Sequence, residues 1–241
     1  MTGLQEWSLN LDRYKAVLFD VDGTLAETER DGHLPAFNQA FAQTGLPWVW
    51  TTTDYAWLLK TTGGYERMQV WARHIGDEQA LTDSGLQILR SAHQLKNRLY
   101  GQIVESGQCP LRPGLVDWMR SLDQAGCPWG VVTTTSRGNW DVLWANSLGQ
   151  AGLSEPAVIV CGEDVTHKKP DPEAYQLAAD RLGLAPSDCL AVEDSPNGLK
   201  AAQASGMPCL VVKSFYFDQA DFTGACAVLA SHQQVRVGGP A

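Results

Sequence analysis

The chain has little positive charge and no long hydrophobic run. Its 241 residues contain 18 Lys and Arg against 27 Asp and Glu, a formal charge of −9. A nucleic-acid-binding protein needs a basic face for phosphates, so we expect no nucleic-acid partner. No apolar stretch approaches the roughly 18 residues that cross a bilayer, and no secretory core opens the chain. We therefore expect no membrane association and a cytoplasmic protein, or a stromal one if an organelle transit peptide was removed.

The cysteines also lack the spacing of a metal or redox site. None of the six forms a CxxC pair, and the missing ligand spacing argues against a metal cluster. Three lie in apolar runs that are typical of strands, so we expect buried free thiols. The length and the hydrophobic content of 44% are ordinary for a globular protein of one or two domains, and we expect a monomer.

Five short apolar runs predict buried parallel strands. Each is rich in β-branched residues and bounded by turn or acidic residues, as in strands covered on both faces; they span residues 16–19, 130–134, 158–161, 189–192 and 209–212. Segments with helical end signals lie between them, from Pro113 to Gly126, from Asp171 (N-cap) and Pro172 to Gly183, and from Pro196 to Gly206. This alternation predicts an α/β fold with a doubly wound, mostly parallel, Rossmann-like sheet core.

The segment from about residue 33 to residue 105 differs, because it contains no convincing strand. Leu34, Phe37 and Phe41 recur at helical spacing, and further apolar residues do so before residue 105. We expect an inserted all-helical cap domain with its tryptophans in the core. The predicted domains are an α/β core of residues 1–29 and 108–241 and a helical cap of residues 30–107.

Two acidic residues, Asp20 and Asp22, follow the first predicted strand. In open α/β sheets, ligands bind at the carboxyl ends of the strands, where both side chains would lie. Neighbouring carboxylates repel each other unless a cation lies between them, and Mg²⁺ accepts one or two carboxylates together with phosphate oxygens. An acidic turn without a ligand is the alternative interpretation of this pair alone.

Three further segments supply complementary groups. Residues 133–136 offer hydroxyls and backbone N–H groups, Lys168 and Lys169 offer cations, and Glu193 with Asp194 offers two more acids. Each has a structural alternative: strand filler, a solvated loop and a helix cap, respectively. Together they place acids, hydroxyls and a cation at one edge of the sheet, which predicts a phosphate and Mg²⁺ site.

These ordered motifs resemble the haloacid dehalogenase-like hydrolases over nearly the whole chain. Residues 162–173 and 193–198 are similar to the β-phosphoglucomutase-like branch, and residues 25–29, 61–64 and 133–136 are similar to its CbbY-type sugar-bisphosphate phosphatases. The resemblance implies a Mg²⁺-dependent phosphatase of a small sugar phosphate, a ketose bisphosphate such as xylulose-1,5-bisphosphate, with an aspartyl-phosphate intermediate. The alternatives are a β-phosphoglucomutase-type phosphoryl transferase and a catalytically silent ligand-binding regulator on the same fold.

The resemblance also implies residue roles. Asp20 is the nucleophile, Asp22 is the general acid and base, and Thr134 and Lys169 hold the transferred phosphoryl group. Mg²⁺ lies between Asp20, the backbone carbonyl of Asp22 and Asp194, with Glu193 nearby. The implied substrate-binding residues are Glu29, His33, Thr62, Gly63, Gly64, Glu66, Arg67, Thr135, Ser136 and Arg137.

One position departs from the CbbY-type pattern. The usual Gly-Gly-Lys-Glu-Arg has Tyr65 in place of Lys, which removes a cation from the implied distal phosphate site. Arg137 is a candidate to compensate. Some cap residues have alternative interpretations: His33 as a surface histidine, Gly63 and Gly64 as an ordinary loop, and Arg67 as a surface charge.

Overall fold

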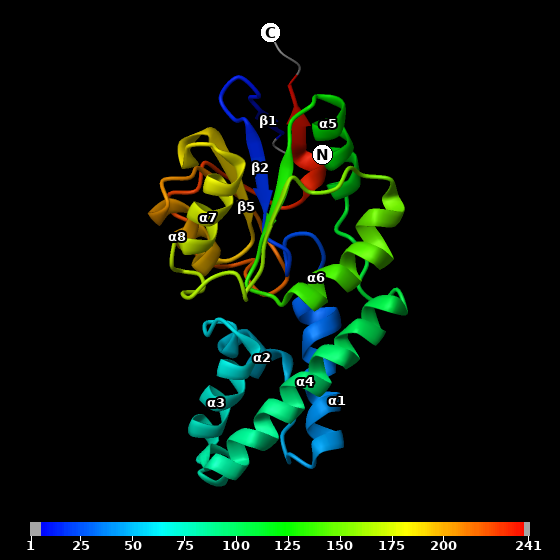
Figure 1. Cartoon of the computed structure of the whole chain (residues 1–241), viewed down its shortest axis with the longest axis vertical. Coiled ribbons are helices and arrows are strands. Elements are labelled where there is room, and N and C mark those ends of the chain that lie inside the picture. Colours follow the sequence, from blue (N-terminus) through cyan, green and yellow to red (C-terminus); the bar gives the residue numbers. More distant parts are fainter. Residues whose placement is uncertain (1–5, 239–241) are drawn as a thin grey trace. The chain divides into compact units, whose positions relative to one another are not determined.

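The computed structural model describes residues 6–238, and the chain divides into two compact units (Figure 1). The α/β unit contains Met1–Glu27 and Pro110–Ala241, and the helical unit contains Thr28–Cys109. Each of the two points where the chain passes from one unit to the other lies two residues from the domain boundary that we expected. The fold class is confirmed: a mostly parallel sheet with flanking helices and an inserted all-helical segment.

The α/β unit is built on a six-stranded sheet in the order β4-β3-β2-β5-β6-β7, in which every pair is parallel. Its strands are β2 (Ala16–Phe19), β3 (Trp129–Val132), β4 (Val158–Val160), β5 (Cys189–Glu193), β6 (Cys209–Val212) and β7 (Ala227–Leu229). The strands that precede the two acidic motifs, β2 and β5, are direct neighbours, with Phe19 opposite Val192. The acidic motifs therefore leave adjacent strands at the same edge of the sheet.

Helices cover both faces of this sheet. Figure 1 shows α7 (Glu173–Leu182) and α8 (Pro196–Ala204) on one side and α5 (Leu115–Gln124) and α6 (Arg137–Leu143) on the other. Every residue of β2, β3 and β5 is buried, which explains their continuous hydrophobicity. Shorter helical turns are η3 (Trp144–Leu148), η4 (Gly149–Ala151), η5 (Pro186–Asp188) and η6 (His232–Gln234).

Several expected boundaries are wrong by one or two residues, and three strands were not expected. β3 ends at Val132, so Thr133 and Thr134 follow the strand instead of closing it, and β4 ends at Val160. α7 has Pro172 as its N-cap, while the Asp171 carboxylate accepts the Glu173 N–H. The missed strands are β1 (Trp7–Leu9) and β8 (Val235–Val237), which pair with each other, and β7. Strands of three residues are too short to show a period-two pattern.

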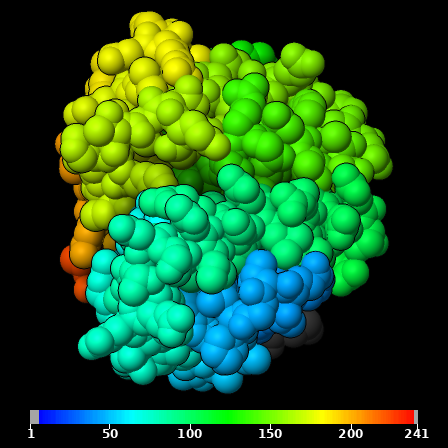
Figure 2. Space-filling model, turned by 60° about the horizontal axis from the view of Figure 1, so that its bottom comes forward, coloured from blue at the N-terminus to red at the C-terminus, as the bar shows by residue number. Residues whose placement is uncertain are grey.

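The helical unit contains only helices and helical turns: η1 (Glu29–His33), α1 (Leu34–Thr44), α2 (Thr52–Leu58), α3 (Gly64–Ile75), η2 (Gln79–Leu81) and α4 (Asp83–Glu105). Its core is aromatic, as expected, with Trp50 packed 4.6 Å from Phe37 and 4.8 Å from Phe41 between ring centroids. Figure 2 shows the segments coloured blue and cyan meeting in one continuous surface. Trp57, on α2, is an exception to the expected burial and is exposed.

All six cysteines are free, and five are buried, which confirms the expectation for all but Cys226. Among residues 6–238, no helix is both long and apolar enough to cross a membrane.

Candidate active site

Four buried charged side chains meet at the carboxyl ends of β2 and β5. Asp20 follows β2, Glu193 ends β5, Asp194 follows it, and Lys169 comes from the loop before α7. One carboxylate oxygen from each acid lies within 4.8 Å of the others. The structure therefore brings together Asp20, Lys169, Glu193 and Asp194, the residues for which the resemblance implies the roles of nucleophile, cation and metal-binding acids.

The Lys169 ammonium lies between two of the acids. Its Nζ is 2.8 Å from Asp20 Oδ1 and 2.6 Å from Glu193 Oε1, and it donates to the Val132 carbonyl at 2.7 Å. Burial alone would lower the pKa of Lys169, but the two carboxylates outweigh it and raise the pKa above its usual value. The lysine therefore stays charged and fixes one oxygen of each acid.

One ammonium among three acids leaves an excess of negative charge. Burial is the main reason why the pKa of Asp20 rises to about 8, with Glu193 and Asp22 adding to the increase and Lys169 opposing it. Burial also raises the pKa of Asp194 well above its usual value, helped by Asp20 and Glu193 and opposed by Ser214 and Arg112. Such a site favours a bound cation, because a cation offsets the repulsion between the carboxylates.

The donor atoms fit a hard divalent metal ion. Glu193 Oε1 accepts both Lys169 and the Tyr175 hydroxyl, the latter at 2.7 Å, whereas Oε2 is buried without a hydrogen-bond partner. An unsatisfied buried carboxylate oxygen is costly unless a metal ion or water binds it. The oxygens of Asp20, Glu193 and Asp194 are the ligand type that Mg²⁺ prefers.

Two glycines let the backbone approach these acids closely. A Cβ atom on Gly198 would lie 1.9 Å from Glu193 Oε2, and one on Gly23 would lie 2.1 Å from Asp194 Oδ2. Gly23 also has a φ of +85°, which other residues rarely adopt. In the sequence, Gly198 is only the last residue of the motif 193–198, and its close approach to Glu193 is visible only in the folded structure.

Replacing Gly198 by Ala is expected to weaken Mg²⁺ binding about tenfold, since disturbing the supports of a metal site typically costs 10–100-fold in affinity. Alanine in a helix normally stabilises a protein relative to glycine by about 1 kcal/mol, but here its methyl group would displace the Glu193 carboxylate. Isothermal titration calorimetry with MgCl₂ measures the change.

Gly138→Ala is the matched control, because Gly138 lies in α6 with open space at its Cβ position. Unchanged Mg²⁺ affinity in both variants would mean that Glu193 is not held by this close approach.

In the run of hydroxyl residues that follows β3, residues 133–136, some side chains are used in local hydrogen bonds and one is not. The Thr135 hydroxyl accepts the Asn139 side-chain amide at 3.1 Å, and Ser136 caps α6 by accepting the Asn139 N–H. Thr133 Oγ1 accepts the Thr135 N–H. Within residues 6–238, Thr134 is the one member of this run whose hydroxyl makes no hydrogen bond, and it is half-buried. Thr134 is therefore the hydroxyl best able to receive a ligand.

The Arg137 side chain forms an ion pair on the surface of α6. Its guanidinium is exposed and pairs with Asp141 one helical turn later, at 3.0 Å. Its backbone N–H donates to the Glu163 carboxylate. Its charge is thus largely matched locally, which weakens the idea that Arg137 compensates for the missing lysine.

Asp22 is half-buried in the tight loop after β2 and contributes to the raised pKa of Asp20. A backbone hydrogen bond from Gly23 to Ala26, at 2.8 Å, closes this loop. The carboxylates of Asp20 and Asp22 are therefore near enough to interact electrostatically, as a nucleophile and its acid–base partner must be.

Within the helical unit, Arg67 and Glu29 form a partly buried ion pair. The guanidinium is 3.1 Å from Glu29 Oε1 and 3.0 Å from the Tyr55 hydroxyl, and it donates to the Thr61 carbonyl at 2.9 Å. Tyr55 in turn donates to Glu29. The interpretation of Arg67 as a surface charge is wrong, since its side chain is buried. Sequence reasoning missed Tyr55, because a tyrosine within an amphipathic helix carries no signal of its partner.

The remaining candidates of the helical unit lie at the starts of its helices. His33 is buried and stacks on Tyr100 with ring centroids 4.1 Å apart, so its interpretation as a surface histidine is wrong. Gly63 is the N-cap of α3 with a φ of +98°, and the exposed Glu66 side chain folds back over it. Thr62 precedes this turn.

Gly64 packs against α4, which excludes an ordinary loop. A Cβ atom on it would lie 2.8 Å from His93 Nε2. The adjacent Tyr65 ring lies 6.3 Å from the His93 ring, and the Arg90 guanidinium lies 5.9 Å from the Tyr65 ring centre. The motif Gly63–Tyr65 is therefore in contact with a histidine and an arginine of α4.

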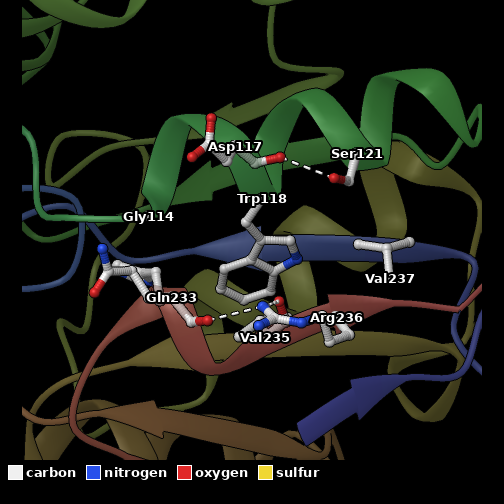
Figure 3. Close-up of a pocket in the computed structure, with 9 residues that line it drawn as sticks. Gly114, Asp117, Trp118, Ser121, Gln233, Val235, Arg236 and Val237 are labelled. Atoms are coloured by element: carbon white, nitrogen blue, oxygen red, sulfur yellow. Dashed lines mark hydrogen bonds between the residues drawn. The ribbon is translucent and has the colours of Figure 1, made fainter. Parts of the chain in front are cut away.

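A separate pocket of about 350 Å³ lies between α5 and the C-terminal segment (Figure 3). Figure 3 shows the Trp118 ring between α5 and Arg236. Trp118 also packs edge-on against Phe19, which precedes Asp20, at 4.9 Å. His232, another lining residue, donates from Nε2 to the Thr24 carbonyl at 2.8 Å, and burial lowers its pKa to about 3. Trp118 and His232 thus contact Phe19 and Thr24, on either side of Asp20 in the sequence, and the lining contains none of the four charged residues of the site.

The pKa of Asp20 predicts how the stability of the metal-free protein depends on pH. A carboxyl whose pKa is raised on folding stabilises the protein fully below its unfolded value, and this contribution is lost as the pH rises through its folded value. Between pH about 4 and about 8, the metal-free protein should therefore lose stability from Asp20. The increase in Tm on adding Mg²⁺ should grow over the same range. Thermal unfolding with EDTA and with MgCl₂ at each pH measures both.

Asp20→Asn provides the control, since its metal-free stability should vary less over this range. A Mg²⁺-induced increase in Tm that does not change between pH 4 and pH 8 would contradict the prediction.

Comparisons with known proteins agree with this geometry. Residues 14–206 match the family model of haloacid dehalogenase-like hydrolases. The chain is 41% identical over 215 residues to the plasmid-encoded protein CbbY of Cupriavidus necator, covering 89% of this chain and 84% of that protein. It is also 41% identical over 211 residues to CbbY of Rhodobacter capsulatus, covering 88% and 90%. The crystal structure of a CbbY variant from Rhodobacter sphaeroides in complex with xylulose-1,5-bisphosphate superposes with a TM-score of 0.83 at 36% identity, covering 93% of this chain and 97% of that one.

Proposed function

Because the chain belongs to the haloacid dehalogenase-like hydrolase family, we propose that it is a Mg²⁺-dependent phosphatase of a small sugar phosphate. The carrying observation is the Lys169 ammonium between Asp20 and Glu193, at the strand ends where the excess negative charge favours a metal ion. The similarity to CbbY proteins supports a ketose bisphosphate as substrate, with xylulose-1,5-bisphosphate as the first candidate.

The proposed reaction has two steps on Asp20. A carboxylate oxygen of Asp20 attacks phosphorus, and the bond between phosphorus and the sugar oxygen breaks as Asp22 gives that oxygen a proton. Asp22 then takes a proton from water, whose oxygen attacks phosphorus and releases phosphate from Asp20. Lys169 already holds Oδ1 of Asp20, which leaves Oδ2 for the attack. Lys169 and Thr134 bind the oxygens of the transferred group.

Asp20, Asp194 and the backbone carbonyl of Asp22 would hold Mg²⁺, with Glu193 Oε2 in the same cluster. The ion supplies positive charge that offsets the acids and the arriving phosphate. The raised pKa values of Asp20 and Asp194 support this, because they reflect burial and a repulsion between carboxylates that a bound cation would offset.

We further propose that the helical unit selects the sugar. Glu29 offers a carboxylate to hydroxyl groups, held in place by Arg67 and Tyr55, while His33 and the segment Thr62–Glu66 provide further contacts. Because Arg67 is paired with Glu29, little of its charge remains for a second phosphate. Tyr65 brings no charge, so the distal phosphate should be bound less tightly than the first.

The experiment that tests the proposal is phosphate release with Mg²⁺ from sugar mono- and bisphosphates, including xylulose-1,5-bisphosphate, ribulose-1,5-bisphosphate and β-glucose-1-phosphate. We expect a strong preference for one ketose bisphosphate. Equal, weak activity on all monophosphates would exclude the ketose bisphosphate as the specific substrate. Conversion of glucose-1-phosphate without phosphate release would identify a phosphoryl transferase instead.

Tyr65→Lys should lower the KM for the preferred bisphosphate about tenfold, as expected for one charge-assisted hydrogen bond. Its KM for the corresponding monophosphate should not change. Tyr65→Phe removes only the hydroxyl and serves as the control for loss of the tyrosine. An equal effect of Tyr65→Lys on both substrates would contradict a role of this position near the second phosphate.

A further inference from the structure

Arg112 is a buried arginine that binds two separate segments of the α/β unit. Its guanidinium donates to the Gly23 carbonyl at 2.6 Å, to the Val212 carbonyl at 3.1 Å and also to the Lys213 carbonyl. Gly23 lies in the loop after β2, whereas Val212 and Lys213 lie where β6 ends. A single side chain therefore joins the loop that follows the nucleophile to the loop that follows β6.

These two segments enclose the Asp194 carboxylate. A Cβ atom on Gly23 would lie 2.1 Å from Asp194 Oδ2 and 3.3 Å from the Ser214 Cβ, so the Gly23 backbone packs against both residues. Ser214 hydrogen-bonds the Asp194 side chain. No hydrogen bond or ion pair joins Arg112 directly to Asp194 in the described part of the chain. Besides the electrostatic attraction between the two charges, the link from Arg112 to Asp194 therefore runs through Gly23 and Ser214.

Glu27 holds Arg112 in turn. Its Oε1 is 3.7 Å from Arg112 Nε, and both of its carboxylate oxygens accept the Phe215 N–H at 3.2 Å. The Arg112 backbone N–H also donates to the Leu25 carbonyl at 2.8 Å. The planar guanidinium reaches several acceptors in fixed directions at once, and a lysine ammonium cannot reproduce that geometry.

We propose that Arg112 is a positioning residue for the metal-binding carboxylate of Asp194, because it holds the Gly23 loop and residues 212–215 together around it. The inference rests on the proposed function, in which Asp194 is a ligand of Mg²⁺. Groups that orient metal ligands typically change metal affinity by about 10–100-fold when they are removed. A loss of that kind distinguishes positioning from a merely structural role, which would lower stability alone.

The test is calorimetric titration of MgCl₂ into the full-length chain and its Arg112→Lys variant. We expect the Kd for Mg²⁺ to rise about tenfold in the variant, while kcat at saturating Mg²⁺ stays within a few-fold of the original. Arg120→Lys, on the exposed side of α5, is the matched control and should leave the Kd unchanged. A Kd for Arg112→Lys within about twofold of the original would overturn the proposal.

Two further variants keep the test decisive. If Arg112→Lys does not fold, Glu27→Gln takes its place: a Kd raised at least about threefold supports the proposal, and an unchanged one overturns it. Asp194→Asn separates this inference from the function on which it rests. If Asp194→Asn binds Mg²⁺ as tightly as the original chain, the proposed metal site is wrong. If Asp194→Asn weakens Mg²⁺ binding but Arg112→Lys does not, only the role of Arg112 is refuted.

Discussion

Asp20→Asn is expected to lower phosphate release by at least about 10³-fold, because an amide oxygen is a poor nucleophile for phosphorus. The same substitution should leave the metal-free protein at least as stable as before at neutral pH. The reason is that burial and the neighbouring acids raise the pKa of Asp20 to about 8, so its charged form is unfavourable in the folded protein. Loss of activity without loss of stability would therefore separate chemistry from folding.

The measurements are phosphate release with Mg²⁺ and thermal unfolding in EDTA. Asp180→Asn, an exposed aspartate of α7, is the matched control and should change neither quantity. Phosphate release by Asp20→Asn at a tenth of the original rate or more would exclude Asp20 as the nucleophile. A large fall in metal-free stability would instead mean that the charged Asp20–Lys169 pair stabilises the fold.

Lys169→Met should lower activity as Asp20→Asn does, but unlike Asp20→Asn it should also lower stability. Lys169 forms ion pairs with both Asp20 and Glu193, and both carboxylates are buried. Removing one partner of a buried ion pair leaves an uncompensated charge, which typically costs about 3–5 kcal/mol in the free energy of unfolding. Activity should fall about 10³-fold as well, since the charge that holds the phosphoryl group is lost.

Urea unfolding at several pH values and phosphate-release rates test this second prediction. The destabilisation should shrink at acidic pH, where the carboxylates are protonated and no charge is left unpaired. Lys168→Met is the matched control: the preceding lysine is only half-buried, and its loss should change stability by less than about 0.5 kcal/mol. Equal effects of the two substitutions would contradict the assignment of Lys169 as the cation of the site.

The sequence predicted the sheet and the composition of the charged cluster for the same physical reason. Strands buried on both faces must be continuously hydrophobic, so the runs that became β2 and β5 were visible, and the acids directly after them had to lie at one edge. Lys169 was preferred to Lys168 in the sequence because it directly precedes the proline of the Lys-Pro motif. In the structure, Lys169 is the lysine that is buried between the acids. The strands β1 and β8 escaped prediction because a polar residue interrupts each three-residue strand, whereas β4, of the same length, is continuously apolar.

Tertiary structure alone decided which polar groups support the site. Tyr175 lies in α7, two residues after the helix begins, and only packing reveals that its hydroxyl donates to Glu193. Arg112 precedes a Pro-Gly turn and carries no motif, yet it is bonded to carbonyls about 90 to 100 residues away in the chain. Likewise, the pairing of Arg67 with Glu29 depends on helices whose relative positions no local pattern specifies.

By itself, the sequence determined the α/β class, the helical insertion and the residue types of the candidate site, because hydrophobic periodicity and the order of motifs are local properties. What only the tertiary structure decided is the electrostatic state of those residues. Burial and the repulsion among three acids that share a single ammonium raise the pKa of Asp20 and of Asp194, and one oxygen of Glu193 is left without a hydrogen-bond partner. Burial and charge–charge interaction depend on distances between segments far apart in the chain, and these distances exist only once the chain has folded.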